Sequence, residues 1–114
     1  MACCNGLNAG KLRNTIHIQR FVGDKTIAGG WNGEWENILT LKAYIKPLSG
    51  GERFFAHRVE SNITHKVYIR YRNDISPADR IEYFGRLFNI KAILNMEEKN
   101  MWLEMPCEEG QNDN

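Results

Sequence analysis

The stretch Ile63-Thr-His-Lys-Val-Tyr-Ile-Arg-Tyr-Arg72 predicts a β-strand, and it decides the fold class of this chain. Apolar side chains alternate along it with polar or basic ones, and a period of two places them on opposite faces of a strand. We expect a buried face that carries Ile63, Val67, Ile69 and Tyr71. The opposite face then carries Thr64, Lys66, Tyr68, Arg70 and Arg72.

Similar short patterns recur on both sides of this strand. Alternation predicts strands over Thr15–Val22, Trp35–Pro47 and Met101–Cys107, and a hairpin over residues 80–94 about Gly85-Arg86. The capping box Ser49-Gly-Gly-Glu52 predicts one short amphipathic helix over residues 49–61. We therefore expect a mainly β fold, a small closed or partly open β-barrel of about six strands with one short side helix.

A glycine-rich segment interrupts the strands between residues 23 and 34. Four glycines in this segment argue for a long flexible loop. Long loops in compact domains are usually functional or disordered. Trp31 is the candidate for an exposed anchor at a protein interface, whereas Trp35, at the start of a strand, is expected in the core.

Length and charge place the chain among ordinary globular domains. Its 114 residues suit a single domain spanning 1–114, with 1–10 and 108–114 as flexible tails. Lys and Arg number 15 against 14 Asp and Glu, so the balance gives no drive toward DNA or an anionic membrane. No apolar run approaches the roughly 20 residues that span a bilayer, and the N-terminus lacks the apolar stretch of a secretion signal.

The motifs of catalysis, cofactor binding and metal binding are absent. There is no nucleophile elbow, and Gly50-Gly51 does not match a phosphate-binding loop. His17, His57 and His65 share no ligand spacing, and the three cysteines, Cys3, Cys4 and Cys107, form neither a zinc motif nor a disulfide framework. We expect no catalytic residues, no cofactor and no metal, and hence no enzyme.

The basic face of the quoted strand leaves one alternative open. Strands that carry basic and aromatic side chains bind single-stranded nucleic acid by stacking and phosphate contact. Lys66, Tyr68, Arg70 and Arg72 would form such a surface on a small β-barrel. An outward barrel face, solvated or used against another subunit, is the interpretation we favour.

An ordered set of segments resembles the head–tail joining, or head closure, proteins of tailed bacteriophages and prophages. No single segment is specific, but together they cover residues 10–110 in the family's order. They are Gly10-Lys-Leu-Arg13, Ile16-His-Ile-Gln-Arg20, the loop with Gly29-Gly30 and Trp35, Ala43-Tyr-Ile-Lys-Pro-Leu-Ser-Gly-Gly-Glu-Arg53, Thr64–Arg72, Asp79-Arg-Ile-Glu-Tyr-Phe-Gly-Arg-Leu-Phe-Asn-Ile90 and Cys107-Glu-Glu-Gly110.

The resemblance implies a structural virion protein in the head–tail connector, present in the host cytoplasm before assembly. It implies a ring of copies beneath the portal and its adaptor, which closes the DNA-filled head and docks the tail. The expected partners are portal, connector and tail proteins, neighbouring copies, and passing DNA without sequence-specific binding. No membrane is involved.

Two sets of residues are the candidates for this role. Arginine pairs bidentately with carboxylates, so we expect assembly contacts from Arg13, Arg20, Arg53, Arg58, Arg70, Arg72 and Trp31. The flexible loop is expected to order on assembly and to face the channel. It comprises Gly23, Asp24, Lys25, Thr26, Ile27, Ala28, Gly29, Gly30, Trp31, Asn32, Gly33 and Glu34.

Overall fold

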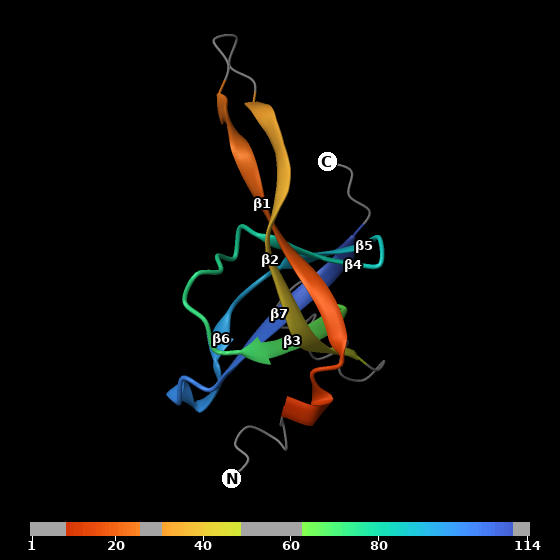
Figure 1. The fold of residues 1–114 in the computed structure, drawn as a ribbon, viewed down its shortest axis with the longest axis vertical. Helices are drawn as coiled ribbons and strands as arrows, with labels where there is room; N and C mark the ends of the chain where they lie inside the picture. Colours follow the sequence, from red (N-terminus) through yellow and green to blue (C-terminus); the bar gives the residue numbers. More distant parts are fainter. Residues whose placement is uncertain (1–8, 26–30, 49–62, 111–114) are drawn as a thin grey trace.

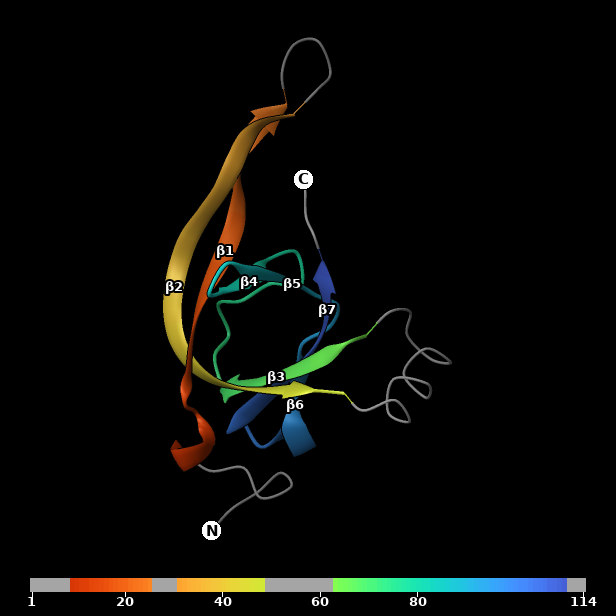
Figure 2. The same ribbon diagram turned by 90° about the vertical axis from the view of Figure 1, so that its right-hand side faces the viewer.

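Seven antiparallel strands form one sheet in the computed structural model, which describes residues 9–25, 31–48 and 63–110. They are β1 (Asn14–Lys25), β2 (Trp31–Pro47), β3 (His65–Arg70), β4 (Arg80–Tyr83), β5 (Arg86–Ile90), β6 (Leu94–Asn95) and β7 (Trp102–Gly110). The strand order is β3-β2-β1-β4-β5-β7-β6, and a further pairing joins β3 to β7. That pairing closes six strands into a barrel, with β6 as an extra strand on β7 (Figures 1 and 2). The expected closed β-barrel is confirmed.

The barrel core comes from the alternating apolar positions of the sequence. Ile16, Ile18, Val67, Ile81 and Phe88 are fully buried. They pack in one cluster with partners from β2 and β7. Closure lets every barrel strand bury one face, and it removes the free sheet edges that promote aggregation.

The first two strands extend well beyond the barrel. β4 pairs with β1 only from His17 to Gln19, but β1 and β2 stay paired from Asn14↔Ala43 out to Lys25↔Trp31. A register shift after Ile18 inserts Ile38 into β2 where the hairpin leaves the barrel, and bulges of this kind bend a strand and increase its twist. We call the projecting part, Arg20–Lys25 and Trp31–Glu36, the arm (Figure 1).

The arm corrects the expected flexible loop. Gly23–Lys25 and Trp31–Glu34 are strand residues in register, and only residues 26–30 lie outside the described part of the chain. Gly33 is not a sign of a flexible loop. Any side chain at this position would place a Cβ atom against the backbone carbonyl of Val22, so the two strands approach too closely for another residue. Close approach of two strands, and not a free loop, explains that glycine.

Several expected boundaries change. Gly110 pairs with Leu87, so residues 108–110 belong to β7 and not to a tail, and residues 9–11 form a 3₁₀ turn, η1 (Ala9–Lys11). Residues 1–8 and 111–114 lie outside the described residues, as does the predicted helix over residues 49–61. Within the described ranges, helical structure is limited to η1 and a second 3₁₀ turn, η2 (Met96–Glu98).

The β4–β5 hairpin turns one residue earlier than expected. Tyr83 pairs with Arg86, so the two turn residues are Phe84 and Gly85. Both have positive φ, 51° and 80°. This is the backbone of the primed turns, whose twist matches that of the flanking strands. Phe84 consequently points away from the core and is exposed.

Candidate assembly surfaces

The outer face of the arm carries two aromatic rings, Phe21 and Trp35. Phe21 and Trp35 are cross-strand partners whose rings meet edge to face at 5.6 Å between centroids. The Arg80 guanidinium, from β4, lies 4.1 Å from the centroid of the Trp35 ring, which is a favourable cation–π distance. Trp35 is therefore half-buried on the outside of the arm, and the expectation that it lies in the core is wrong.

A buried carboxylate fixes the base of the arm to the barrel. Arg20 donates from Nε and Nη2 to the two Asp79 carboxylate oxygens, both at 2.9 Å. Asp79 is buried, and it also accepts a hydrogen bond from the Ser76 backbone N–H. Arg20 was expected to contact a partner protein, but in the free chain its guanidinium is held by Asp79.

Removal of this carboxylate should destabilise the fold. Asp79→Ala leaves the Arg20 guanidinium and the Ser76 N–H without their acceptor, and we expect a loss of about 1–3 kcal/mol in the free energy of unfolding. Asp74→Ala is the control, because Asp74 is exposed and pairs with Arg72 at the surface, where ion pairs contribute little. Urea denaturation would compare the two, and equal losses would contradict the role given to Asp79.

A second ion pair joins the β4–β5 hairpin to β7. Arg86 donates to Glu109 at 2.9 and 3.1 Å, and His65 Nε2 lies 3.9 Å from the same carboxylate. The hydrogen bond from Arg86 lowers the pKa of Glu109 below its usual 4.5. Because the pKa of Glu109 is lower in the folded chain than in the unfolded chain, its charge stabilises the fold at pH values above the unfolded-state pKa. This contribution is lost as the pH falls through the folded-state pKa.

Glu109→Gln should therefore lower the melting temperature at neutral pH but not in acid. At an acid pH below the folded-state pKa of Glu109 the wild-type carboxylate is protonated, so the difference between the two proteins should shrink toward zero. Thermal melts followed by circular dichroism at both pH values measure this difference. A difference of the same size at both would show that the charge on Glu109 does not stabilise the fold.

The expected nucleic-acid face is not an exposed stacking platform. Tyr68 is only 8% exposed, and it packs with Trp102 beneath Leu12, Tyr44 and Met96. Lys66 pairs with Glu104 at 3.1 Å and Arg72 with Asp74 at 2.9 Å. Tyr68 lies on the outer face of β3, as alternation predicts, but Leu12 and Met96 pack against it and Trp102, so its ring is not exposed for stacking. Tyr71, expected to be buried, is 38% exposed.

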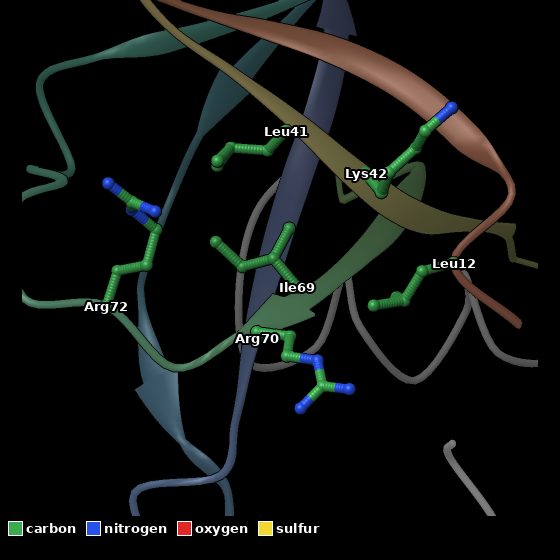
Figure 3. Close-up of a pocket in the computed structure, with 6 residues that line it drawn as sticks. All are labelled: Leu12, Leu41, Lys42, Ile69, Arg70 and Arg72. Carbon is green, nitrogen blue, oxygen red and sulfur yellow. The ribbon is translucent and has the colours of Figure 1, made fainter. Parts of the chain in front are cut away.

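An opening in the barrel wall lies where β2 and β3 diverge. Their ladder ends at Tyr44↔Tyr68, and beyond it is a cavity of about 390 Å³. We call it the side opening, and its lining consists of Leu12, Leu41, Lys42, Ile69, Arg70 and Arg72 (Figure 3). Sequence reasoning singled out Arg70 and Arg72 but missed Lys42 and the three apolar residues, because nothing in the sequence tells where two paired strands separate.

The other expected interface residues are scattered. Arg13 lies after η1, where its Nε donates to the Gly10 carbonyl at 3.1 Å. Trp31 is the first residue of β2 and pairs with Lys25. Arg53 and Arg58 lie outside the described residues. The structure brings Arg70 and Arg72 together at the side opening, and Arg20, at the base of the arm, donates to the carbonyl of Asp74, whose carboxylate pairs with Arg72. Trp31 lies farther out, on the arm.

The described residues contain no metal-binding cluster, and the one cysteine among them is buried. In ranges 9–25, 31–48 and 63–110, no group of three or more His, Cys, Asp or Glu side chains is arranged to hold a metal ion. Burial raises the pKa of the Cys107 thiol to about 12, so it stays protonated and unreactive at neutral pH. Cys3, Cys4 and His57 lie outside the described part.

The remaining histidines have local partners. His17 Nδ1 lies 3.0 Å from Thr40 Oγ1, and His65 Nδ1 lies 2.8 Å from Thr64 Oγ1. These are side-chain contacts on and beside the strands, as expected for structural histidines.

Among the described residues, no helix is long and apolar enough to cross a membrane.

Comparison with known proteins gives this barrel a family. The model of the phage head completion protein family matches residues 7–110. The chain therefore belongs to the phage head completion proteins, which are structural components of the virion. The resemblance to head–tail joining proteins drawn from the sequence is confirmed.

Two curated phage proteins are similar in sequence. Head completion protein gp7 of Enterobacteria phage HK97 is 24% identical over 109 residues, which cover 91% of this chain and 97% of gp7. Head completion protein gp16 of Bacillus phage SPP1 is 26% identical over 74 residues, which cover 65% of this chain and 68% of gp16.

Two solved structures share the fold. The solution structure of protein SF1141 from Shigella flexneri 2a is 30% identical, with a TM-score of 0.75 over 94% of this chain and all of that one. A chain from the virion of a native gene transfer agent particle is 20% identical, with a TM-score of 0.64 over 87% of this chain and 96% of that one. The second likeness shows the shared fold alone.

Proposed function

We propose that this protein forms a ring layer in the head–tail connector, beneath the portal and its adaptor. There it closes the DNA-filled head and provides the surface on which the tail docks. The observation that carries this proposal is the family match over residues 7–110, together with the alignment to HK97 gp7 along nearly all of that protein. The whole chain acts as one domain in this role, without a cofactor and without catalysis.

The partners follow from that position. They are portal and adaptor proteins on one side, tail proteins on the other, and neighbouring copies within the ring. Before assembly the protein resides in the host cytoplasm, and no membrane takes part. A formal net charge of +1 suits a channel wall that lets DNA pass, because affinity for DNA grows with the number of phosphates a protein neutralises.

The arm is the part we assign to the channel and to contacts with other subunits. The arm extends beyond the part of β1 that pairs with β4. Two apolar side chains on it, Phe21 and Val22, are 40% and 44% exposed. Exposed apolar side chains on a projecting hairpin are suited to a protein partner. The expected interface residues remain Arg13, Arg70, Trp31, and Arg53 and Arg58 outside the described part. Arg20 is paired with Asp79, and Arg72 is paired with Asp74. These two arginines can bind a partner only if they share or release those carboxylates.

Complementation of incomplete heads tests the proposal. DNA-filled heads that carry the portal but lack this protein would be mixed with the purified chain and with tails. We expect the chain to reduce leakage of DNA from the heads and to raise the fraction of tailed particles. Unchanged DNA leakage and unchanged tail joining would refute the proposed function.

A further inference from the structure

The inner face of the arm is acidic and partly apolar. On β2, Glu34 and Glu36 lie two residues apart and therefore on one face, opposite Val22 and Arg20 of β1. Both glutamates are exposed, and the described residues supply neither with an ion-pair partner. Arg20 opposite Glu36 is already neutralised by Asp79. The face thus carries two uncompensated carboxylates beside an exposed Val22.

The side opening has the complementary chemistry. Leu41 and Ile69 lie close together between β2 and β3, with Arg70 and Arg72 on two sides of them, and Lys42 at the rim extends outward across β1 (Figure 3). Lys42 donates to the neutral Thr15 hydroxyl at 2.8 Å, and the Arg70 guanidinium lies 5.5 Å from the Trp102 ring centroid. Within the described part of the chain neither cation has a carboxylate partner. The opening therefore offers two uncompensated positive charges around an apolar floor.

The acidic face of the arm and the side opening lie at different places along β2. The arm projects from one end of the barrel in both views (Figures 1 and 2), whereas Leu41 and Lys42, which line the opening, lie farther along β2, toward its end at Pro47. Glu36 and Lys42 are six positions apart (42 − 36) on this extended strand, which is about 20 Å, so the glutamates of an arm do not reach the opening of their own chain. Two different complementary surfaces on one chain make a head-to-tail contact, which generates a closed ring when the rotation between copies closes.

The chemistry of the opening favours a protein occupant over a nucleic acid. Half of its lining side chains are apolar, and the nearby Tyr68 and Trp102 rings are buried, so neither of these two rings offers an exposed face on which a base could stack. Complementary charge between two protein surfaces, by contrast, fixes their register and suppresses wrong partners.

We propose that the arm of one copy docks its Glu34 and Glu36 face into the side opening of the next copy, against Lys42 and Arg70. The contact repeats around the ring, and each copy contributes an arm to one neighbour and an opening to the other. This inference deepens the proposed function and rests on it, because the ring is its setting.

Paired charge reversals test the contact. The arm variant carries Glu34→Lys and Glu36→Lys, and the opening variant carries Lys42→Glu and Arg70→Glu. Each variant alone opposes like charges at every contact, so we expect its retention on portal-bearing heads to fall at least about tenfold. Retention is measured by sedimenting the heads and quantifying the protein that sediments with them.

An equal mixture of the two variants should restore retention. The lysines of the arm variant meet the glutamates of the opening variant, and at the next contact the wild-type arm of the opening variant meets the wild-type opening of the arm variant. Alternating copies therefore satisfy every contact in an even-numbered ring. Recovery to within about threefold of wild type is expected, and recovery also shows that both variants are folded.

Glu97→Lys with Glu98→Lys is the matched control, because it makes the same charge change at two exposed residues of η2. It should behave as wild type. Wild-type retention of the single variants, or a mixture as defective as each variant alone, would overturn the docking contact while leaving the proposed function intact. Failure of the wild-type chain itself to sediment with the heads would overturn both.

Discussion

Phe88→Ala is expected to lower the free energy of unfolding by about 3–5 kcal/mol. The Phe88 ring is fully buried at the centre of the barrel, where strands β1, β4, β5 and β7 contribute to one cluster. Its removal leaves a cavity that the surrounding strands cannot fill, because closure of the barrel restricts their movement. A loss of this size is a large part of the roughly 5–15 kcal/mol that stabilises a domain.

Phe84→Ala is the matched control for this prediction. Phe84 is the same residue type four positions earlier, but it lies in the β4–β5 turn and is 86% exposed. Its removal should change stability by less than about 0.5 kcal/mol. Urea denaturation of both variants gives the comparison, and a small loss for Phe88→Ala would show that the barrel core is not where the structure places it.

Shortening the arm is expected to abolish head joining without unfolding the barrel. The register gives a clean design, because Phe21 and Trp35 are directly paired and residues 22–34 can be replaced by the two-residue turn Asn-Gly. The fully buried residues of the barrel lie outside this segment, so the melting temperature should change little. Tail joining and DNA retention should fall to the level of heads without the protein.

Lys99→Ala serves as the control for the shortened arm. Lys99 is an exposed residue in the turn before β7, where it pairs only with the equally exposed Glu97 at 3.2 Å. This variant should join heads as the wild type does. Normal tail joining by the shortened chain, at wild-type concentrations, would remove the arm from the mechanism.

The sequence predicted the barrel because alternation is a local signal. The alternation of apolar and polar residues is enough to identify the buried face at Ile16, Ile18, Val67 and Ile69, which are all buried in the structure. Closure depends on the pairing of β3 with β7, which joins Val67 to Met105 across 38 positions (105 − 67). Only the barrel-like number and spacing of strands pointed to that pairing.

The length of the arm could not be predicted in the same way. The glycine-rich composition predicted a loop that includes Gly23 and Gly33, yet these two residues are paired with each other across β1 and β2. Glycine raises flexibility in an isolated chain, but in a two-stranded ribbon it also permits close backbone approach. Which of the two applies depends on the partner strand, and the sequence of one segment does not contain that information.

The surface chemistry was the least predictable part. The Arg20–Asp79 pair joins residues 59 positions apart, and it converts an expected interface arginine into a structural one. Tyr68 alternates correctly with Val67 and Ile69, but the outer face of its strand is covered by Leu12 and Trp102. Alternation separates the faces of a strand, and it does not tell which faces a distant segment covers.

Electron microscopy of portal-bearing heads mixed with this protein tests the central claim most directly. We predict a new ring of density at the portal vertex, in which the arm of each barrel reaches the side opening of its neighbour. Heads whose portal vertex is unchanged by saturating protein, under conditions in which the chain is folded, would contradict the account.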